Sequence, residues 1–264
     1  MKLILWETLK GQRIGLALVA LGLLAFTILI PSTFKSFGAS GDLMNALPEA
    51  FRVIVKAQGG FPTTSTGYLA VGYRDPIFVV IMTASVIALA SGALAREIER
   101  GTIFLILSRP LNRYNLLIAK LTALVFALSA LIIVSLIGTA VGVAINNIES
   151  VDFVTLGLVL VNAFMVVLSV AGYSFLVSAL CSEVNRAISI STGFTVVFFF
   201  TDFLATLWSS VAFLGPVSVF HYYDPLSIVE TGRLPSLDIV MLGVIAVLGF
   251  FCAGIIFQRR DLAG

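Results

Sequence analysis

The sequence contains few charged residues, one histidine and two cysteines. Only 11% of its 264 residues are charged, whereas about a quarter are charged in a typical soluble domain. The single histidine, His221, and the separated cysteines, Cys181 and Cys252, cannot supply the usual ligand sets of zinc, haem or iron–sulfur centres. We therefore expect no metal site, and we expect both cysteines to be free.

Several other functions are excluded by what is missing. The dipeptide Gly-Lys never occurs, so the chain has no phosphate-binding loop of the form G-x-x-x-x-G-K-[ST]. Intramembrane hydrolysis would need further histidines or a paired catalytic set. A net charge of +2 is too small to indicate nucleic acid as a partner. The chain is therefore not expected to be an enzyme.

Apolar residues dominate what is present. They make up 59% of the chain, and the mean hydropathy is +1.08. Nearly uncharged runs long enough to cross a hydrocarbon core of about 30 Å as helices predict an all-α, polytopic membrane protein with six transmembrane helices in one domain, 1–264. The predicted spans are 14–34, 77–95, 121–146, 153–181, 187–210 and 238–257.

Signals between the spans refine this outline. Asp75-Pro76 predicts the start of the second span, with Asp as N-cap and Pro in the first turn. The fifth apolar run extends to Tyr223 and is too long for one helix. Residues 211–236 are therefore predicted to form an outer re-entrant or interfacial element. Residues 1–13 suit a short helix in the cytosolic interface, or a frayed end.

Lys and Arg set the orientation, because basic residues resist translocation. Eleven of the sixteen lie in the N-terminal segment, the 96–120 connection, the turn at Arg186 and the tail, and five lie in the other connections. Both termini are therefore expected in the cytosol. The predicted location is a cell membrane, spanned several times, of the bacterial or archaeal cytoplasmic kind.

The connection 96–120 is the most distinctive segment. It holds five of the sixteen basic residues. If it continues as a helix, Arg96 with Glu99 and Glu97 with Arg100 are each three residues apart and can pair. Charge alone fits an ordinary loop that only sets topology.

The order of residues in this connection carries a resemblance to a known family. Glu97 and Glu99 precede Gly101-Thr102, and a Leu-rich stretch, Pro110, Arg113 and Lys120 follow. This order resembles the first intracellular loop of six-span permeases of type-2 ABC exporters, especially stand-alone permeases of the nitrous-oxide-reductase maturation and antibiotic or lipid exporter kind. Ala119-Lys120 stands here in place of that family's Gly-Lys.

The resemblance implies a permease subunit that exports a hydrophobic or amphipathic substrate. Its implied partners are two cytosolic ABC ATPase subunits, a second permease subunit, the same or homologous, and the lipid bilayer. The chain itself would hold no cofactor, and ATP and Mg would bind the ATPase. Residues 96–120 would be the coupling loop, with contact residues Arg96, Glu97, Glu99, Arg100, Gly101, Thr102, Arg109 and Arg113. The alternative is an ATP-independent transporter or channel.

Asp202 is the one acidic residue inside the fifth apolar run. An unpaired charge there would cost about 2.5 to 3.5 kcal/mol on insertion scales, so it must face the bundle interior or a water-filled path. It either lines the transport route or bonds a neighbouring span through a polar group such as Asn162. The segment that follows is predicted to be a structural re-entrant element, and the resemblance includes it: His221, Tyr222, Tyr223, Asp224 and Pro225.

Small residues recur every three or four positions in three spans. Such rows let helices approach closely, within one subunit or between two. The sequence leaves that choice open. The rows are Ala84, Ala88 and Gly92; Gly138 and Gly142; and Ala246, Gly249 and Ala253.

Overall fold

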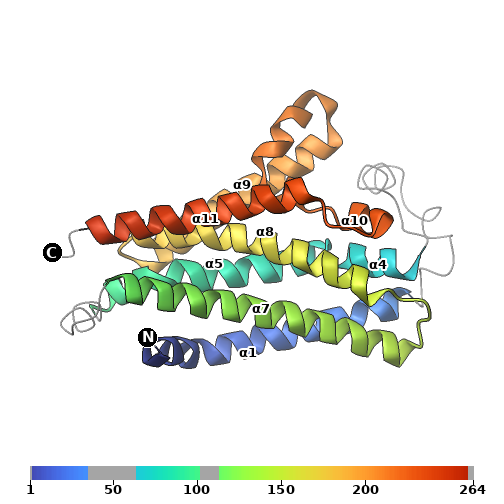
Figure 1. The fold of residues 1–264 in the computed structure, drawn as a ribbon, viewed down its shortest axis with the longest axis horizontal. Coiled ribbons are helices and arrows are strands. Elements are labelled where there is room, and N and C mark those ends of the chain that lie inside the picture. The colour runs from blue at the N-terminus through green and yellow to red at the C-terminus, as the bar shows by residue number, and fades with distance from the viewer. Residues whose placement is uncertain (1, 35–63, 102–112, 261–264) are drawn as a thin grey trace.

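The structure is a computed structural model, and it describes residues 2–34, 64–101 and 113–260. Six long helices run along one bundle (Figure 1). They are α1 (Lys2–Thr33), α5 (Pro76–Glu99), α7 (Arg113–Asn146), α8 (Phe153–Leu180), α9 (Val184–Leu207) and α11 (Ser236–Arg259). Each contains a stretch long and apolar enough to cross a membrane, which confirms the six predicted spans.

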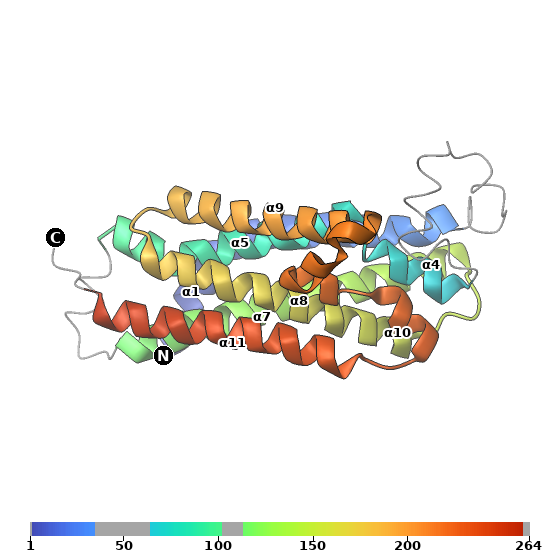
Figure 2. The same cartoon turned by 90° about the horizontal axis from the view of Figure 1, so that it is seen from above.

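The bundle is organised around α8, which packs against α5, α11, α9 and α7 (Figure 2). Helix α1 packs mainly on α7 at the periphery. Helix α1 begins, and α11 ends, at the same end of the bundle, here called the terminal end (Figure 1). The other end, which carries α4 (Ser65–Gly72) and α10 (Pro225–Thr231), is called the opposite end.

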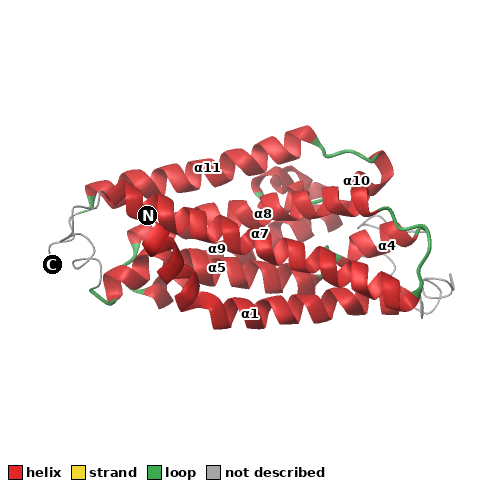
Figure 3. Ribbon diagram, turned by 60° about the horizontal axis from the view of Figure 1, so that its bottom comes forward, coloured by secondary structure: helices red, strands yellow, loops and turns green. Residues whose placement is uncertain are grey.

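The segment after α9 forms two short 3₁₀ helices, η2 (Ser209–Val217) and η3 (Val219–Tyr222). They turn back along α9, where the Ser218 hydroxyl donates to the Phe198 carbonyl at 2.7 Å. The fifth apolar run therefore contains more than one helix, as expected. The described residues contain helices and loops but no strand (Figure 3), in agreement with the all-α prediction.

Acidic N-caps begin several of these helices. Asp75 accepts from the Ile77 amide and precedes Pro76 in the first turn of α5, which confirms the predicted start. Asp152 caps α8 through two backbone amides. The bond from the Thr155 hydroxyl, together with these backbone bonds, lowers the pKa of the Asp152 carboxyl. Asp224 and Pro225 repeat the Asp-Pro arrangement at the start of α10. The same dipeptide in the sequence indicates a helix start there.

The helices are longer at the terminal end than the apolar runs predicted. Helix α5 continues through 96–99, and α7 begins at Arg113 and not at 121. The predicted connection 96–120 therefore shortens at both sides. Glu97 and Glu99 in the added turn of α5, and Lys120 in the added part of α7, bond to other helices, so a run free of charge marks only the minimum length of a span.

The N-terminal segment is helical, but it is not a separate helix. One helix runs from Lys2 to Thr33, so 1–13 and the first span are continuous over the described residues. Its position in a membrane interface stays a prediction. Asp42 is followed by apolar residues at near helical spacing, Leu43, Leu47, Phe51, Ile54 and Val55, which predict a further helix. This segment lies outside the described residues.

Two rows of small residues pack inside the subunit. A methyl group at Gly142 would lie 2.7 Å from the Ile28 carbonyl oxygen, and Gly138 faces Thr27, so α7 and α1 touch through backbone. A methyl group at Gly172 would lie 2.8 Å from the Ala246 carbonyl oxygen, and Gly249 faces Gly172 directly. These approaches leave no room for a side chain.

The third row divides between interior and surface. Ala84 and Ala88 are exposed on α5, whereas Gly92 is buried against the Arg96 side chain. Only the last member therefore lies at a contact within the subunit.

Candidate functional site

An ion pair joins the ends of α5 and α7 at the terminal end. The Lys120 ammonium lies 2.6 Å from the Glu97 Oε1, and the two side chains are 8% and 20% exposed. The expected pairs Arg96–Glu99 and Glu97–Arg100 are not among the ion pairs of the described residues. Glu97 reaches across to α7 and not along its own helix, because this contact compensates the buried ammonium.

Glu99 connects the same end of α5 to α9. Its Oε2 accepts a hydrogen bond of 3.0 Å from the backbone N–H of Val184, the first residue of α9. The N-cap residue of α9, Glu183, makes no side-chain capping bond. Glu99 thus supplies from another helix the carboxylate that a helix N-terminus favours.

The end of α11 is fastened to the α8–α9 turn. The Arg260 guanidinium donates to the Ala179 and Cys181 carbonyls at 2.7 and 3.0 Å and to the Ser182 hydroxyl at 2.6 Å. These bonds satisfy carbonyls that the end of α8 leaves without helical partners. Cys181 and Cys252 are free thiols, as expected.

A serine binds the backbone of α5 just before its charged turn. The Ser178 hydroxyl of α8 donates to the Ser91 carbonyl at 2.7 Å and accepts from the amides of Leu94 and Ala95. Ser91 also bonds Ser191 of α9 at 3.1 Å. The last turns of α5 are therefore attached to α7, α8 and α9 through polar contacts.

The other predicted contact residues differ in placement. Arg100 is exposed and follows α5, Arg96 is half-buried, and Gly101 has a φ of +67° that favours glycine. Thr102 and Arg109 lie outside the described residues, and Arg113 is the first residue of α7. Glu97 and Glu99 thus make contacts within the subunit, although Glu99 is exposed, whereas Arg100 is exposed and makes no ion pair among the described residues.

At the opposite end, Asp202 lies close to the Arg74 guanidinium and the His221 imidazole, both from outside α9. Its carboxylate lies 3.9 Å from the Arg74 guanidinium and 3.8 Å from the His221 Nδ1, while Arg74 also lies 3.7 Å from Asp224. The suggested partner Asn162 bonds elsewhere, donating to the Tyr222 carbonyl at 3.0 Å. Sequence reasoning missed Arg74 because it lies 128 positions before Asp202.

The predicted outer element is strongly bonded to the bundle. The Tyr223 hydroxyl donates to the Tyr73 carbonyl at 2.7 Å, and the Tyr73 hydroxyl bonds Thr139 at 2.6 Å. Burial raises the pKa of Tyr73 to about 12 and raises that of Tyr223 as well, so both hydroxyls remain neutral. Tyr222 donates to the Pro216 carbonyl. These bonds support the structural reading of 221–225.

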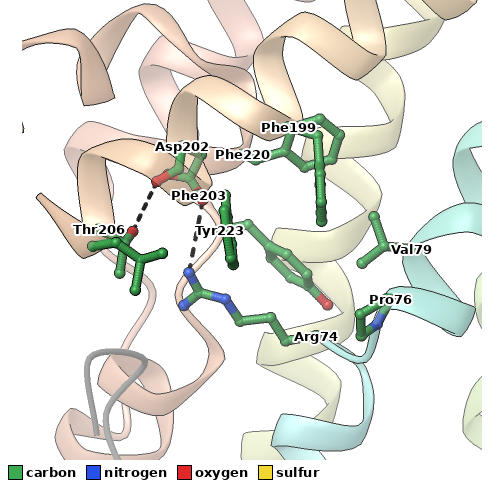
Figure 4. A pocket seen from close by; sticks show the side chains of 10 residues that line it. Arg74, Pro76, Val79, Phe199, Asp202, Phe203, Thr206, Phe220 and Tyr223 are labelled. Carbon is green, nitrogen blue, oxygen red and sulfur yellow. Dashed lines mark hydrogen bonds and ion pairs between the residues drawn. The ribbon is translucent and has the colours of Figure 1, made fainter. Parts of the chain in front are cut away.

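A pocket of about 80 Å³ opens beside Asp202. Figure 4 shows the Arg74 side chain approaching Asp202 across it, with aromatic rings on the facing wall. We call it the Asp202 pocket. Its lining residues are Arg74, Pro76, Val79, Phe199, Asp202, Phe203, Thr206, Leu207, Phe220 and Tyr223.

The six apolar helices, with α5 bonded to three of its neighbours through polar groups at the terminal end, define a multi-span membrane protein. The chain belongs to the ABC-2 family of transporter proteins, whose family model matches residues 12–262. It is therefore the membrane permease component of an ABC transporter, which works with an ABC ATPase in a lipid bilayer.

A curated relative is similar over much of its length. The chain is 25% identical over 224 residues to the uncharacterized protein YhcI of Bacillus subtilis (strain 168), covering 76% of this chain and 71% of that protein.

Proposed function

We propose that this permease exports a hydrophobic or amphipathic substrate, driven by ATP and Mg bound on two separate cytosolic ATPase chains. A second permease subunit, the same or homologous, completes the assembly. The proposal is supported most by the last turns of α5, which are attached to α7 through Glu97, to α9 through Glu99 and to α8 through Ser178 of that helix. A push on these turns reaches α7, α8 and α9 together.

The contacts suggest how a movement of this end of α5, caused by the ATPase, is passed to the neighbouring helices. Packed helices shift as rigid units and not by continuous deformation, so the Glu97–Lys120 pair carries motion to α7 and the Glu99–Val184 bond carries it to α9. Arg100 is exposed at the start of the connection and is offered to the ATPase. The two acidic residues therefore transmit motion, and Arg100 receives it.

The test is Arg100→Ala in the permease co-expressed with its ATPase chain. We expect association to weaken about three- to tenfold, because a rim charge that meets an oppositely charged surface mainly affects encounter. Arg233→Ala, an exposed arginine at the opposite end, is the matched control and should bind like wild type. Binding and stimulated ATP hydrolysis are measured together in nanodiscs.

Unchanged association and unchanged stimulation in Arg100→Ala would contradict the assignment of this surface. Export by the chain in the absence of any ATPase would contradict ATP-driven function and support the ATP-independent alternative.

A further inference from the structure

The walls of the Asp202 pocket have two characters. Phe199, Phe203, Phe220 and Tyr223 contribute aromatic rings, and Asp202 contributes a carboxylate at the same cavity. A volume of about 80 Å³ is smaller than the ~150 Å³ cavity that accepts benzene. The pocket therefore admits a small head group and not a whole amphiphile.

The charges beside the pocket do not cancel. Arg74 faces two carboxylates, Asp202 at 3.9 Å and Asp224 at 3.7 Å, so one negative charge remains when His221 is neutral. Both distances exceed hydrogen-bonding range. No hydrogen bond to the Asp202 carboxylate is made by any residue that the structure describes, although that side chain is only 14% exposed. The carboxylate thus retains acceptor capacity toward the pocket.

We propose that this pocket binds the cationic head group of an amphipathic molecule, an amine or quaternary ammonium. Asp202 is its counter-ion, and the aromatic faces attract the same charge through their quadrupoles. The apolar tail lies along the exposed Phe200 and Leu204 of α9, in lipid. This inference rests on the proposed function, since it names the substrate class that the permease would carry.

Arg74 competes with this ligand. Its guanidinium is 27% exposed and lies as close to Asp224 as to Asp202, so it can remain paired with Asp224 when a ligand takes Asp202. Neutralising Arg74 should therefore strengthen binding, whereas neutralising Asp202 should weaken it. A purely structural role for the pair would weaken binding or leave it unchanged in both variants.

The experiment uses the purified full chain in neutral-lipid nanodiscs, without ATPase. Radiolabelled hexyltrimethylammonium is the probe, hexyl sulfate is the anionic analogue of equal chain length, and empty nanodiscs correct for partitioning. We expect Asp202→Asn to lower affinity at least about tenfold, because a charge-assisted contact is lost. Asp238→Asn removes a nearby carboxylate that does not line the pocket and should change affinity less than about twofold.

Arg74→Gln should raise affinity several-fold. The proposal is overturned if hexyl sulfate binds and the ammonium does not, if Asp202→Asn binds like wild type, or if Arg74→Gln fails to strengthen binding. Thermal unfolding of each variant identifies a folding defect, and the rise in Arg74→Gln cannot come from one. This binding experiment contains no ATPase, so its result does not depend on the outcome of the Arg100 experiment. A failure to bind the ammonium here would likewise not contradict coupling to the ATPase.

Discussion

The Lys120 ammonium is largely buried at the terminal end of the bundle, where the Glu97 carboxylate compensates its charge. The side chain is 8% exposed, and the contact measures 2.6 Å. Removing one partner of such a pair leaves an uncompensated charge, which costs about 3 to 5 kcal/mol when burial is complete. Because Glu97 retains 20% exposure, the lower part of that range applies.

Glu97→Gln should therefore lower the free energy of unfolding by roughly 3 kcal/mol. The measurement is the midpoint of thermal or denaturant unfolding in nanodiscs. Glu230→Gln, an exposed glutamate at the opposite end, is the control and should behave as wild type. Exchange of the two charges, Glu97→Lys with Lys120→Glu, should restore part of the loss. Equal midpoints for Glu97→Gln and Glu230→Gln would show that the pair contributes nothing.

Among the elements, α8 and α11 make a close backbone contact. Gly172 and Gly249 face one another with no space for a side chain. In a membrane, packing of this kind supplies much of the association between helices, since lipid chains are as apolar as the side chains themselves. One added methyl group at this crossing must push the two helices apart.

Gly249→Ala should therefore destabilise the chain by about 1 to 3 kcal/mol, the usual cost of overpacking. Gly243→Ala on the same helix is the matched control, because its added methyl would lie 3.4 Å from the Met165 terminal carbon, an ordinary contact. That variant should be neutral or stabilise by up to about 1 kcal/mol through helix propensity. Thermal unfolding of the two variants measures the difference in stability. Equal stability would show that α8 and α11 do not touch closely at Gly249.

Helix α9 is held differently. Only Ala187, Ser191 and Thr195 of its residues are buried, so a single narrow stripe meets the bundle. Polar contacts supplement it at three levels: Glu99 at its start, Ser91 at its middle and Arg74 near its end. Each of these three partners lies on α5 or directly before it, and the Tyr173 hydroxyl of α8 bonds Thr195 as well, so α9 is attached to both α5 and α8.

For the whole molecule, the start of α1 and the end of α11 lie at one end of the bundle (Figure 1). Which membrane face that end meets is a prediction from the basic residues, eleven of which belong to the N-terminal segment, the 96–120 connection, the turn at Arg186 and the tail. Glu183 lies in an exposed turn there, and Thr231 lies exposed at the opposite end.

In a variant without Cys181 and Cys252, a cysteine introduced at Thr231 should react with a membrane-impermeant thiol reagent in intact cells. A cysteine at Glu183 should react only after the cells are opened. The readout is the labelled fraction before and after permeabilisation. The reversed pattern would invert the orientation and would place the Asp202 pocket in the cytosol.

Much of the helical outline could be predicted from the sequence because hydropathy and helix caps act locally. A span can be recognised by about twenty consecutive, mostly apolar residues, whatever it packs against. Asp75-Pro76 marks the start of a helix through bonds to its own first turn. The charged connection likewise identified the family from the order of its residues.

The partners of single side chains could not be predicted this way. From the sequence, Lys120 is interpreted as the end of a loop, and only the structure shows Glu97 beside it. Asp202 is likewise interpreted as an isolated charge, and only the structure shows Arg74 beside it. The glycine rows likewise allow helix contacts within one subunit or between two. The structure shows that they pack within the subunit, α7 against α1 and α8 against α11.

The sequence by itself determined the six spans and the family, because those follow from composition and residue order along a continuous stretch of chain. The tertiary structure decided which helices touch, which charges are paired and where the Asp202 pocket opens. The physical reason is that these contacts join residues far apart in sequence, and their energies depend on distances and burial that exist only once the helices have packed.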